Sequence, residues 1–264
     1  MIAIVLIAMA AGCASALMFA SIISGALASL LLFYLAPLPL MVAALGWGPL
    51  SATFGGIAAA TGLGAIFSLP YCIAFTIMVA LPAWWLGHLS LLGRPIDNGT
   101  LSGTGTASAA PDLEWYPVGR ILLWISGFST LITMGALLTL GTDAKAITDT
   151  LRQGLQQIIP IIGRRDADPT GETGQLIDAL VTTAPVASVV VTMTTLTVNL
   201  WLSAKITATS GRLRRPWPNL KGTMLPPMTL AALCLAIAAC GAGGLVAILA
   251  QIVTATLVTA YAFV

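Results

Sequence analysis

The sequence predicts an all-α protein, a polytopic bundle of transmembrane helices. Residues 1–93 contain no Asp, Glu, Lys or Arg, so water cannot solvate a surface built from them. Hydrophobic residues occupy 58% of the 264 positions and charged residues only 8%, whereas a soluble domain carries about 25% charged residues. Several apolar runs exceed the ~18 residues that mark a membrane span. We therefore expect a single integral membrane domain over residues 1–264, embedded in a lipid bilayer.

Proline and glycine clusters divide the apolar sequence into about eight spans, with seven as the lower count. Pro37 and Pro39 are expected to kink or break the second span, because proline cannot donate a helical hydrogen bond. Polar loops are expected at residues 94–117 and 203–223. The predicted spans lie near residues 2–20, 24–45, 50–67, 70–92, 118–140, 176–202, 224–239 and 243–264.

Residues 143–162 have a different pattern, in which apolar residues recur at helical spacing and Asp, Arg and Gln lie between them. This pattern predicts an amphipathic helix that lies on the membrane surface or caps the bundle. Such a helix would be either a connector packed on the spans or a lid over a pocket. The apolar positions are Ile147, Leu151, Leu155, Ile158, Ile159 and Ile162.

The positions of the basic residues predict the orientation of the chain. Loop 203–223 contains no acidic residue, and its cations are Lys205, Arg212, Arg214, Arg215 and Lys221. Such a loop faces the cytoplasm by the positive-inside rule. Counting spans from it places loop 94–117 and both termini in the cytoplasm, and the amphipathic segment 142–175 in the periplasm. We therefore expect a multi-pass protein of the bacterial inner (cytoplasmic) membrane.

The sequence contains no pattern that favours catalysis. No ionisable residue is expected at the middle of a span, where such residues usually mark function, and no Walker, GxSxG or HExxH motif occurs. The four cysteines lie in apolar segments without CxxC spacing, and His88 is the single histidine. The net charge of +2 is too small to indicate nucleic-acid binding. We expect no enzyme activity, no catalytic or metal-binding residues and no cofactor.

The first span contains small residues at every fourth position, namely Ala8, Gly12, Ala16 and Ala20. Small residues at this spacing let two helix backbones approach closely, which favours association in lipid. The face would serve either packing inside the bundle or docking of a partner membrane protein.

The sixth span contains a polar stripe at positions i, i+4, i+7 and i+11, formed by Ser188, Thr192, Thr195 and Asn199. Hydroxyl groups can bond to the preceding turn of their own helix, but the Asn199 amide does this less easily. We therefore expect Asn199 to find a partner on another helix, or the stripe to line a polar cavity.

Short motifs in and beside the polar segments carry a family resemblance. They are Glu114-Trp115-Tyr116-Pro117-Val118-Gly119-Arg120, Asn199-Leu200-Trp201-Leu202-Ser203, residues 210–220 (SGRLRRPWPNL), residues 34–40 (YLAPLPL) and Leu81-Pro82-Ala83. Over essentially its whole length the chain resembles the YybS-like family of uncharacterised multi-pass bacterial membrane proteins.

The YybS-like family is distantly similar to the S components of energy-coupling-factor vitamin transporters. The resemblance implies a helical bundle that binds a small molecule near its outer face and docks on a coupling protein through small residues of its first helix. S components typically have six spans, whereas this chain is predicted to have eight, and its sequence shows no vitamin-specific residues.

These observations predict a membrane-embedded solute-binding or transport subunit that resembles an S component and has no ATPase of its own. Its partners would be a membrane protein and a small-molecule ligand. The alternative is a non-catalytic structural or assembly subunit of a larger membrane complex. A further hypothesis is that the basic loop binds anionic lipid.

Overall fold

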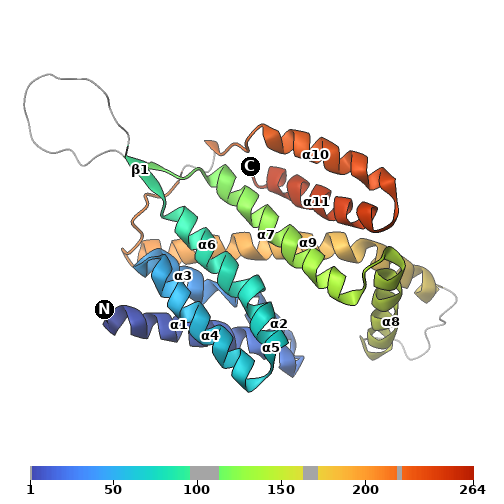
Figure 1. Cartoon of the computed structure of the whole chain (residues 1–264), viewed down its shortest axis with the longest axis horizontal. Helices are drawn as coiled ribbons and strands as arrows, with labels where there is room; N and C mark the ends of the chain where they lie inside the picture. Colours follow the sequence, from blue (N-terminus) through green and yellow to red (C-terminus); the bar gives the residue numbers. More distant parts are fainter. Residues whose placement is uncertain (1, 96–112, 163–171, 219–221) are drawn as a thin grey trace, which may run out of the picture. The chain divides into compact units, whose positions relative to one another are not determined.

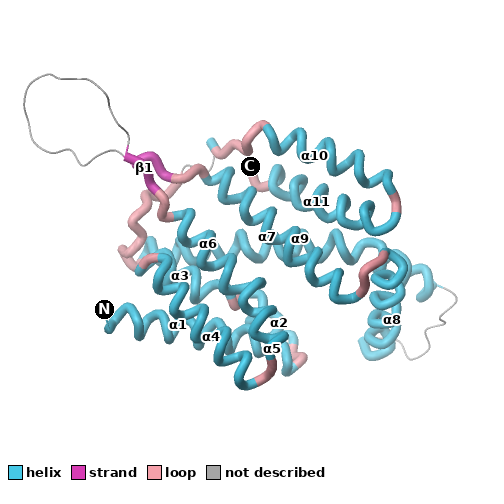
Figure 2. Tube along the Cα trace, viewed as in Figure 1, coloured by secondary structure: helices cyan, strands magenta, loops and turns pink. Residues whose placement is uncertain are grey.

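The computed structural model describes residues 2–95, 113–162, 172–218 and 222–264, and these are almost entirely helical (Figures 1 and 2). Within them, seven helical segments are long and apolar enough to cross a membrane. Large apolar side chains such as Leu27 (89% exposed) and Leu235 (72% exposed) lie on the surface, where only lipid is a favourable solvent. The prediction of an all-α, multi-pass membrane bundle is confirmed.

The seven spans match the lower count that the sequence predicts. The eighth expected span, near 224–239, is a shorter apolar segment, Met228–Ala242. It begins late because Pro227 stands at the helix N-cap, and it ends at Gly243, whose φ is +77°. Its 15 residues rise about 22 Å, less than the ~30 Å of a bilayer core. The spans are Ile2–Ser24, Leu27–Trp47, Pro49–Ile66, Leu69–Ser90, Val118–Leu140, Gly174–Thr209 and Gly244–Ala262.

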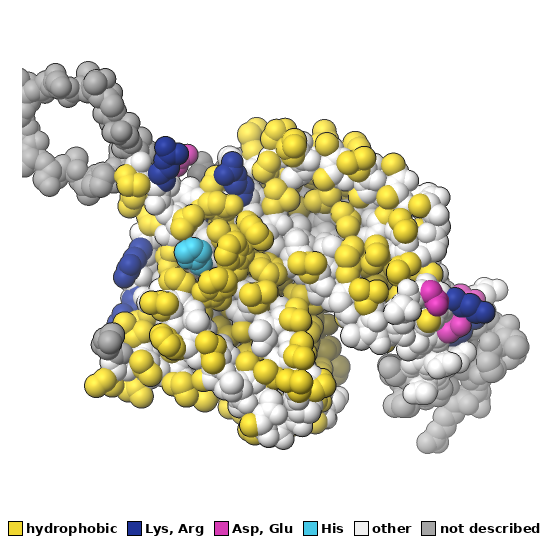
Figure 3. Space-filling view, viewed as in Figure 1, with side chains coloured by type: hydrophobic (Ala, Val, Ile, Leu, Met, Phe, Trp, Pro, Cys, Tyr) yellow, Lys and Arg dark blue, Asp and Glu magenta, His cyan; other side chains and the backbone are white. Residues whose placement is uncertain are grey.

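The sequence predicts one membrane domain, and the described helices pack as two compact units. The first unit comprises Met1–Ile121 and Thr197–Met224, and the second comprises Leu122–Leu196 and Leu225–Val264. In each unit the spans expose hydrophobic side chains along their length (Figure 3). The long helices α7 and α9 contribute to both units.

Four helices of the first unit have a proline in their first turn. Proline is favoured in the first turn of a helix because no N–H donor is needed there, and it occupies the first or second position of α3, α4, α5 and α6. The break expected at Pro37 is confirmed, since α2 and α3 are separate helices. The elements are α1 (Ile2–Ala20), α2 (Leu27–Tyr34), α3 (Pro37–Trp47), α4 (Pro49–Ile66), α5 (Leu69–Phe75), a π-helical turn (Thr76–Ala80) and α6 (Leu81–Ser90).

Helices α1 and α4 approach until their backbones touch. A Cβ atom added to Gly12 would overlap the carbonyl oxygen of Gly55, and a Cβ added to Gly55 would overlap the carbonyl oxygen of Ala8. Only glycine fits at both positions. Dispersion between closely packed backbones is a main source of helix association in lipid, so this contact fixes α1 on α4.

The segment expected as a polar loop at 94–117 contains a short antiparallel pair of strands. Strand β1 (Gly93–Pro95) pairs antiparallel with β2 (Leu113–Trp115), with Arg94 opposite Glu114. The Tyr116 N–H donates to the Leu92 carbonyl and extends the pairing (2.9 Å). A three-residue strand is too short to produce a recognisable alternation in the sequence.

The second unit is built around a buried cluster of Leu137, Ile147, Val189 and Ile252. These residues come from α7 (Val118–Leu140), α8 (Ala144–Ile162), α9 (Glu172–Thr209) and α11 (Gly244–Ala262). Helix α10 (Met228–Ala239) packs on α11, with the Thr229 and Tyr261 hydroxyls hydrogen-bonded at 2.6 Å.

The amphipathic helix expected at 143–162 is confirmed as α8. The Asp143 carboxylate caps it by accepting from the Ala146 N–H at 2.7 Å, and Ile147 is fully buried. The side chains of Ile158, Ile159 and Ile162 lie outside the described residues. Its position at the membrane surface stays a prediction.

We predict that Gly12→Ala lowers the thermal stability of the purified protein, because overpacking a close contact costs about 1–3 kcal/mol. Gly62→Ala in α4 is the matched control, because no atom lies within 4 Å of a Cβ added there. The melting temperature of each variant in mild detergent checks this. Equal melting temperatures would contradict the close contact of α1 and α4.

Candidate functional site

The first half of the small-residue face of α1 packs inside the chain, and its second half is partly exposed. Ala8 and Gly12 are buried and take part in the contact with α4. Ala16 and Ala20 are half-buried. The structure therefore uses the first half of this face within the bundle, and partner docking at the second half stays a prediction.

The polar stripe of α9 does not act as one surface. The Ser188 hydroxyl donates to the Pro185 carbonyl (2.9 Å), and the Thr192 hydroxyl donates to the Ser188 carbonyl (2.8 Å). Ser188, Thr192 and Thr195 belong to the second unit, whereas Asn199 belongs to the first. Two of the hydroxyls therefore satisfy the backbone of their own helix, as serine and threonine commonly do.

Asn199 has the interhelical partner that the sequence predicts. Its side chain is 1% exposed, and its Nδ2 donates to the Tyr34 carbonyl oxygen at 2.8 Å. In a continuous helix this carbonyl would accept from the Leu38 N–H, but that N–H bonds to the Leu35 carbonyl instead. The change follows from Pro37, whose ring prevents a regular helical turn. Asn199 thus satisfies a carbonyl that the proline break leaves without its helical donor.

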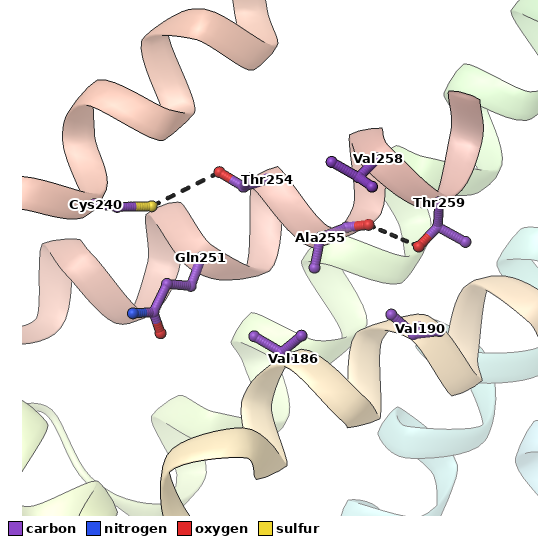
Figure 4. Close-up of a pocket in the computed structure, with 8 residues that line it drawn as sticks. All are labelled: Val186, Val190, Cys240, Gln251, Thr254, Ala255, Val258 and Thr259. Atoms are coloured by element: carbon purple, nitrogen blue, oxygen red, sulfur yellow. Dashed lines mark hydrogen bonds between the residues drawn. The ribbon is translucent and has the colours of Figure 1, made fainter. Parts of the chain in front are cut away.

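A groove in the second unit lies between α9 and α11, beside the 3₁₀ turn Cys240–Ala242 that links α10 to α11 (Figure 4). It is a shallow groove, largely open to the surface, with a volume of about 400 Å³. Residues spaced by three or four share a helix face, and both helices present such a face here. The lining residues are Val186, Val190, Cys240, Gln251, Thr254, Ala255, Val258 and Thr259.

Gln251 is the groove residue with hydrogen-bonding capacity to spare. The Cys240 thiol and Thr254 hydroxyl face each other at 3.7 Å, and the Thr259 hydroxyl donates to the Ala255 carbonyl at 2.7 Å. Gln251 is exposed near the middle of α11, and within the described residues its amide has no hydrogen-bond partner. Its two N–H donors and its carbonyl are therefore available to a molecule in the groove.

Sequence reasoning missed this groove, because its two walls lie far apart in the chain. One signal was present: Gln251 is the only amide or charged residue between Met224 and Val264. A single amide in an apolar span is costly in lipid unless a partner satisfies it. Gln251 was therefore the residue from which a polar site in this part of the chain could have been predicted.

The described side chains of α8 do not line the groove. It packs through Ile147 into the core of the second unit, and Arg152 forms a surface ion pair with Asp178 of α9 at 2.5 Å. These contacts favour the interpretation of α8 as a packed connector over that of a lid.

The basic loop predicted at 203–223 begins within a helix. Helix α9 continues to Thr209, because no glycine or proline lies between Ser203 and Gly211, whose φ is +67°. The structure places Lys205 on the last turns of α9 and Arg212, Arg214 and Arg215 after it, all in the first unit. Lys221 lies outside the described residues.

The cations of the basic loop contact aromatic rings and a carbonyl. The Arg212 guanidinium lies 4.6 Å from the Trp47 ring centroid, and the Lys205 Nζ lies 5.3 Å from that of Trp217. The Arg215 Nη1 donates to the Ser90 carbonyl at 3.5 Å. Arg215 is half-buried, and this desolvation lowers the pKa of its guanidinium.

Among the described residues, groups that could hold a metal ion or perform acid–base chemistry do not converge. No cluster of three or more His, Cys, Asp or Glu side chains occurs in the described part of the chain. His88 lies among aromatic rings on α6, with ring centroids 6.3 Å from Trp84 and 6.1 Å from Trp85. The cysteines are not disulfide-bonded.

No protein-family model, curated protein or solved structure matches this chain. The resemblance to the YybS-like family therefore stays a prediction from the sequence motifs.

We predict that Asn199→Leu destabilises the protein by about 1–3 kcal/mol, the usual cost of leaving a buried polar group unpaired. The Tyr34 carbonyl would lose its donor in an apolar setting. Thr192→Val is the control, because the Thr192 hydroxyl bonds only to its own helix. Thermal unfolding in detergent measures both variants. A similar loss in the two variants would show that the Asn199–Tyr34 hydrogen bond contributes little.

Proposed function

We propose that this chain is a membrane-embedded solute-binding subunit of a transport system, similar in role to an S component and without an ATPase or any other enzyme activity of its own. The groove between α9 and α11 supports this proposal, because an amide with available donors and acceptor lies in a hollow otherwise lined by small apolar and hydroxyl side chains. Such a site suits a small, largely apolar molecule with one hydrogen-bonding group. None of the lining residues is charged, so the preferred solute is neutral.

The alternative is a non-catalytic structural or assembly subunit of a larger membrane complex. The exposure of Gln251 supports this alternative as well. An amide at the surface of a span can hydrogen-bond to a polar side chain of a neighbouring membrane helix. In that case the groove would receive a helix of a partner protein rather than a solute.

Native mass spectrometry of the protein purified in mild detergent distinguishes the two functions. The solute-binding function predicts a small molecule retained at unit stoichiometry by the wild type. Gln251→Leu should weaken this retention about 2- to 12-fold, the equivalent of one typical hydrogen bond. Gln156→Leu, which removes an exposed amide from α8, should leave it unchanged.

Solute binding would be contradicted if the wild type retained no small molecule but co-purified with protein subunits that Gln251→Leu lost. This result would favour the structural role. Equal retention of the small molecule by Gln251→Leu and Gln156→Leu would place it elsewhere on the protein.

We further propose that the protein lies in the bacterial inner membrane with both termini in the cytoplasm. This orientation requires the short α10 to cross the bilayer as α11 does. The hydrogen bond between Thr229 at the start of α10 and Tyr261 at the end of α11 supports it, because the two helices then lie antiparallel along most of their length.

Reporter fusions test this orientation. Green fluorescent protein fused at either terminus should fluoresce, and alkaline phosphatase inserted after Gly141, before α8, should be active. Both reporters depend on the side of the membrane that they reach. Phosphatase activity at the C-terminus would show that α10 does not cross the membrane.

A further inference from the structure

The cytoplasm-facing end proposed for the first unit has a strong excess of positive charge. Six Lys and Arg residues lie in the described part of this unit, against one carboxylate, Glu114. Glu114 is opposite Arg94 in the hairpin. Lys205, Arg212 and Arg215 therefore have no carboxylate partner in the part of the chain that the structure describes.

The backbone after α9 holds Arg212 in a fixed place. Gly211 ends the helix in the left-handed region, and the Arg212 and Leu213 N–H groups both donate to the Thr207 carbonyl at 2.9 and 3.1 Å. The Gly211 N–H also donates to the Ala208 carbonyl at 3.0 Å, and this hydrogen bond together with the one from Arg212 to Thr207 is typical of a glycine-terminated helix. The chain turns back on itself, and the Arg212 Cβ comes within 4.0 Å of a Cβ added to Gly46.

The contacts of these cations leave their donors available. A guanidinium that stacks on an aromatic face keeps its N–H groups in its own plane, where they can bind two oxygens of a phosphate. The Arg212 guanidinium carbon lies over the Trp47 ring, and the Lys205 ammonium lies over the Trp217 ring. An aromatic ring attracts a cation but does not neutralise it.

Arg215 is the third cation of this group, and it is half-buried. Its contact with the Ser90 carbonyl is long, at 3.5 Å, and its burial disfavours the charged form. A charge withdrawn from water is stabilised by a nearby opposite charge. An anionic group at this surface would supply that charge.

The surrounding side chains indicate which anion would bind. Trp201 and Lys205 are one turn apart on α9 and share a face, and Trp201 is 48% exposed. Trp217, between Pro216 and Pro218, is 45% exposed. A phospholipid can place its phosphate on the cations and its acyl chains on these apolar surfaces, whereas a free phosphate would use the cations alone.

We propose that the basic-aromatic surface formed by Lys205, Arg212, Arg215, Trp47 and Trp217 binds the headgroup of an anionic phospholipid. This site is independent of the groove in the second unit, so either can fail without the other.

Native mass spectrometry of the full chain, titrated with phosphatidylglycerol or phosphatidylcholine in detergent, tests the site. The wild type should retain phosphatidylglycerol preferentially. Each cation near an anionic headgroup adds about five-fold in affinity, so Arg212→Gln combined with Arg215→Gln should weaken binding about 25-fold. Lys145→Gln combined with Arg152→Gln removes the same charge from α8 and should have little effect.

Trp47→Leu separates an ordered site from diffuse attraction, because it leaves the net charge unchanged. It should weaken phosphatidylglycerol binding about two- to five-fold, as loss of a cation–π contact does. The melting temperature of each variant identifies a folding defect, and Arg212→Lys, which keeps the charge, provides a milder substitution with a smaller expected loss. Equal binding of the two lipids, equal loss in both charge variants, or displacement of the lipid by inorganic phosphate would overturn the proposal.

Discussion

The first unit depends on the rule that every backbone polar group inside a membrane needs a partner. Pro37 breaks the second span, and the Tyr34 carbonyl then lacks its helical donor. The Asn199 amide replaces that donor across 165 residues of sequence. One hydrogen bond therefore joins the broken span to α9. This also explains why a single buried amide lies in an otherwise hydroxyl-containing stripe, since Ser or Thr would bond to its own helix instead.

Close backbone packing supplies the second constraint on this unit. Gly12 and Gly55 let α1 and α4 touch, and Gly87 of α6 similarly admits Ala44 of α3, because a Cβ added there would lie 2.5 Å from the Ala44 Cβ. The ends of α3 and α6 carry Trp47 and Ser90, which receive Arg212 and Arg215. Small residues within the bundle thus position Trp47 and Ser90, the groups that contact the cations after α9.

The sequence predicted the features of the fold that depend only on residues close together in the chain. Hydropathy located the spans, helical periodicity located α8, and Pro37 located the break between α2 and α3. Sequence could not decide whether Ala8 and Gly12 face a partner or α4, because the same spacing serves both. The groove was also missed, since Val186 and Gln251 come from different helices. The length of α10 depended on Pro227 and Gly243, whose effects on helix ends are uncertain by several residues in sequence reasoning.

The two candidate sites require ligands of opposite character. The groove has an amide, hydroxyls, a thiol and aliphatic side chains but no charge. An ionised ligand there would lose its hydration without gaining a counter-charge, and this loss is expensive in an apolar setting. The basic-aromatic surface has cations without a described carboxylate partner, so a neutral ligand would leave their charge uncompensated. We therefore expect a solute of the groove to be neutral and an anionic ligand to prefer the basic-aromatic surface.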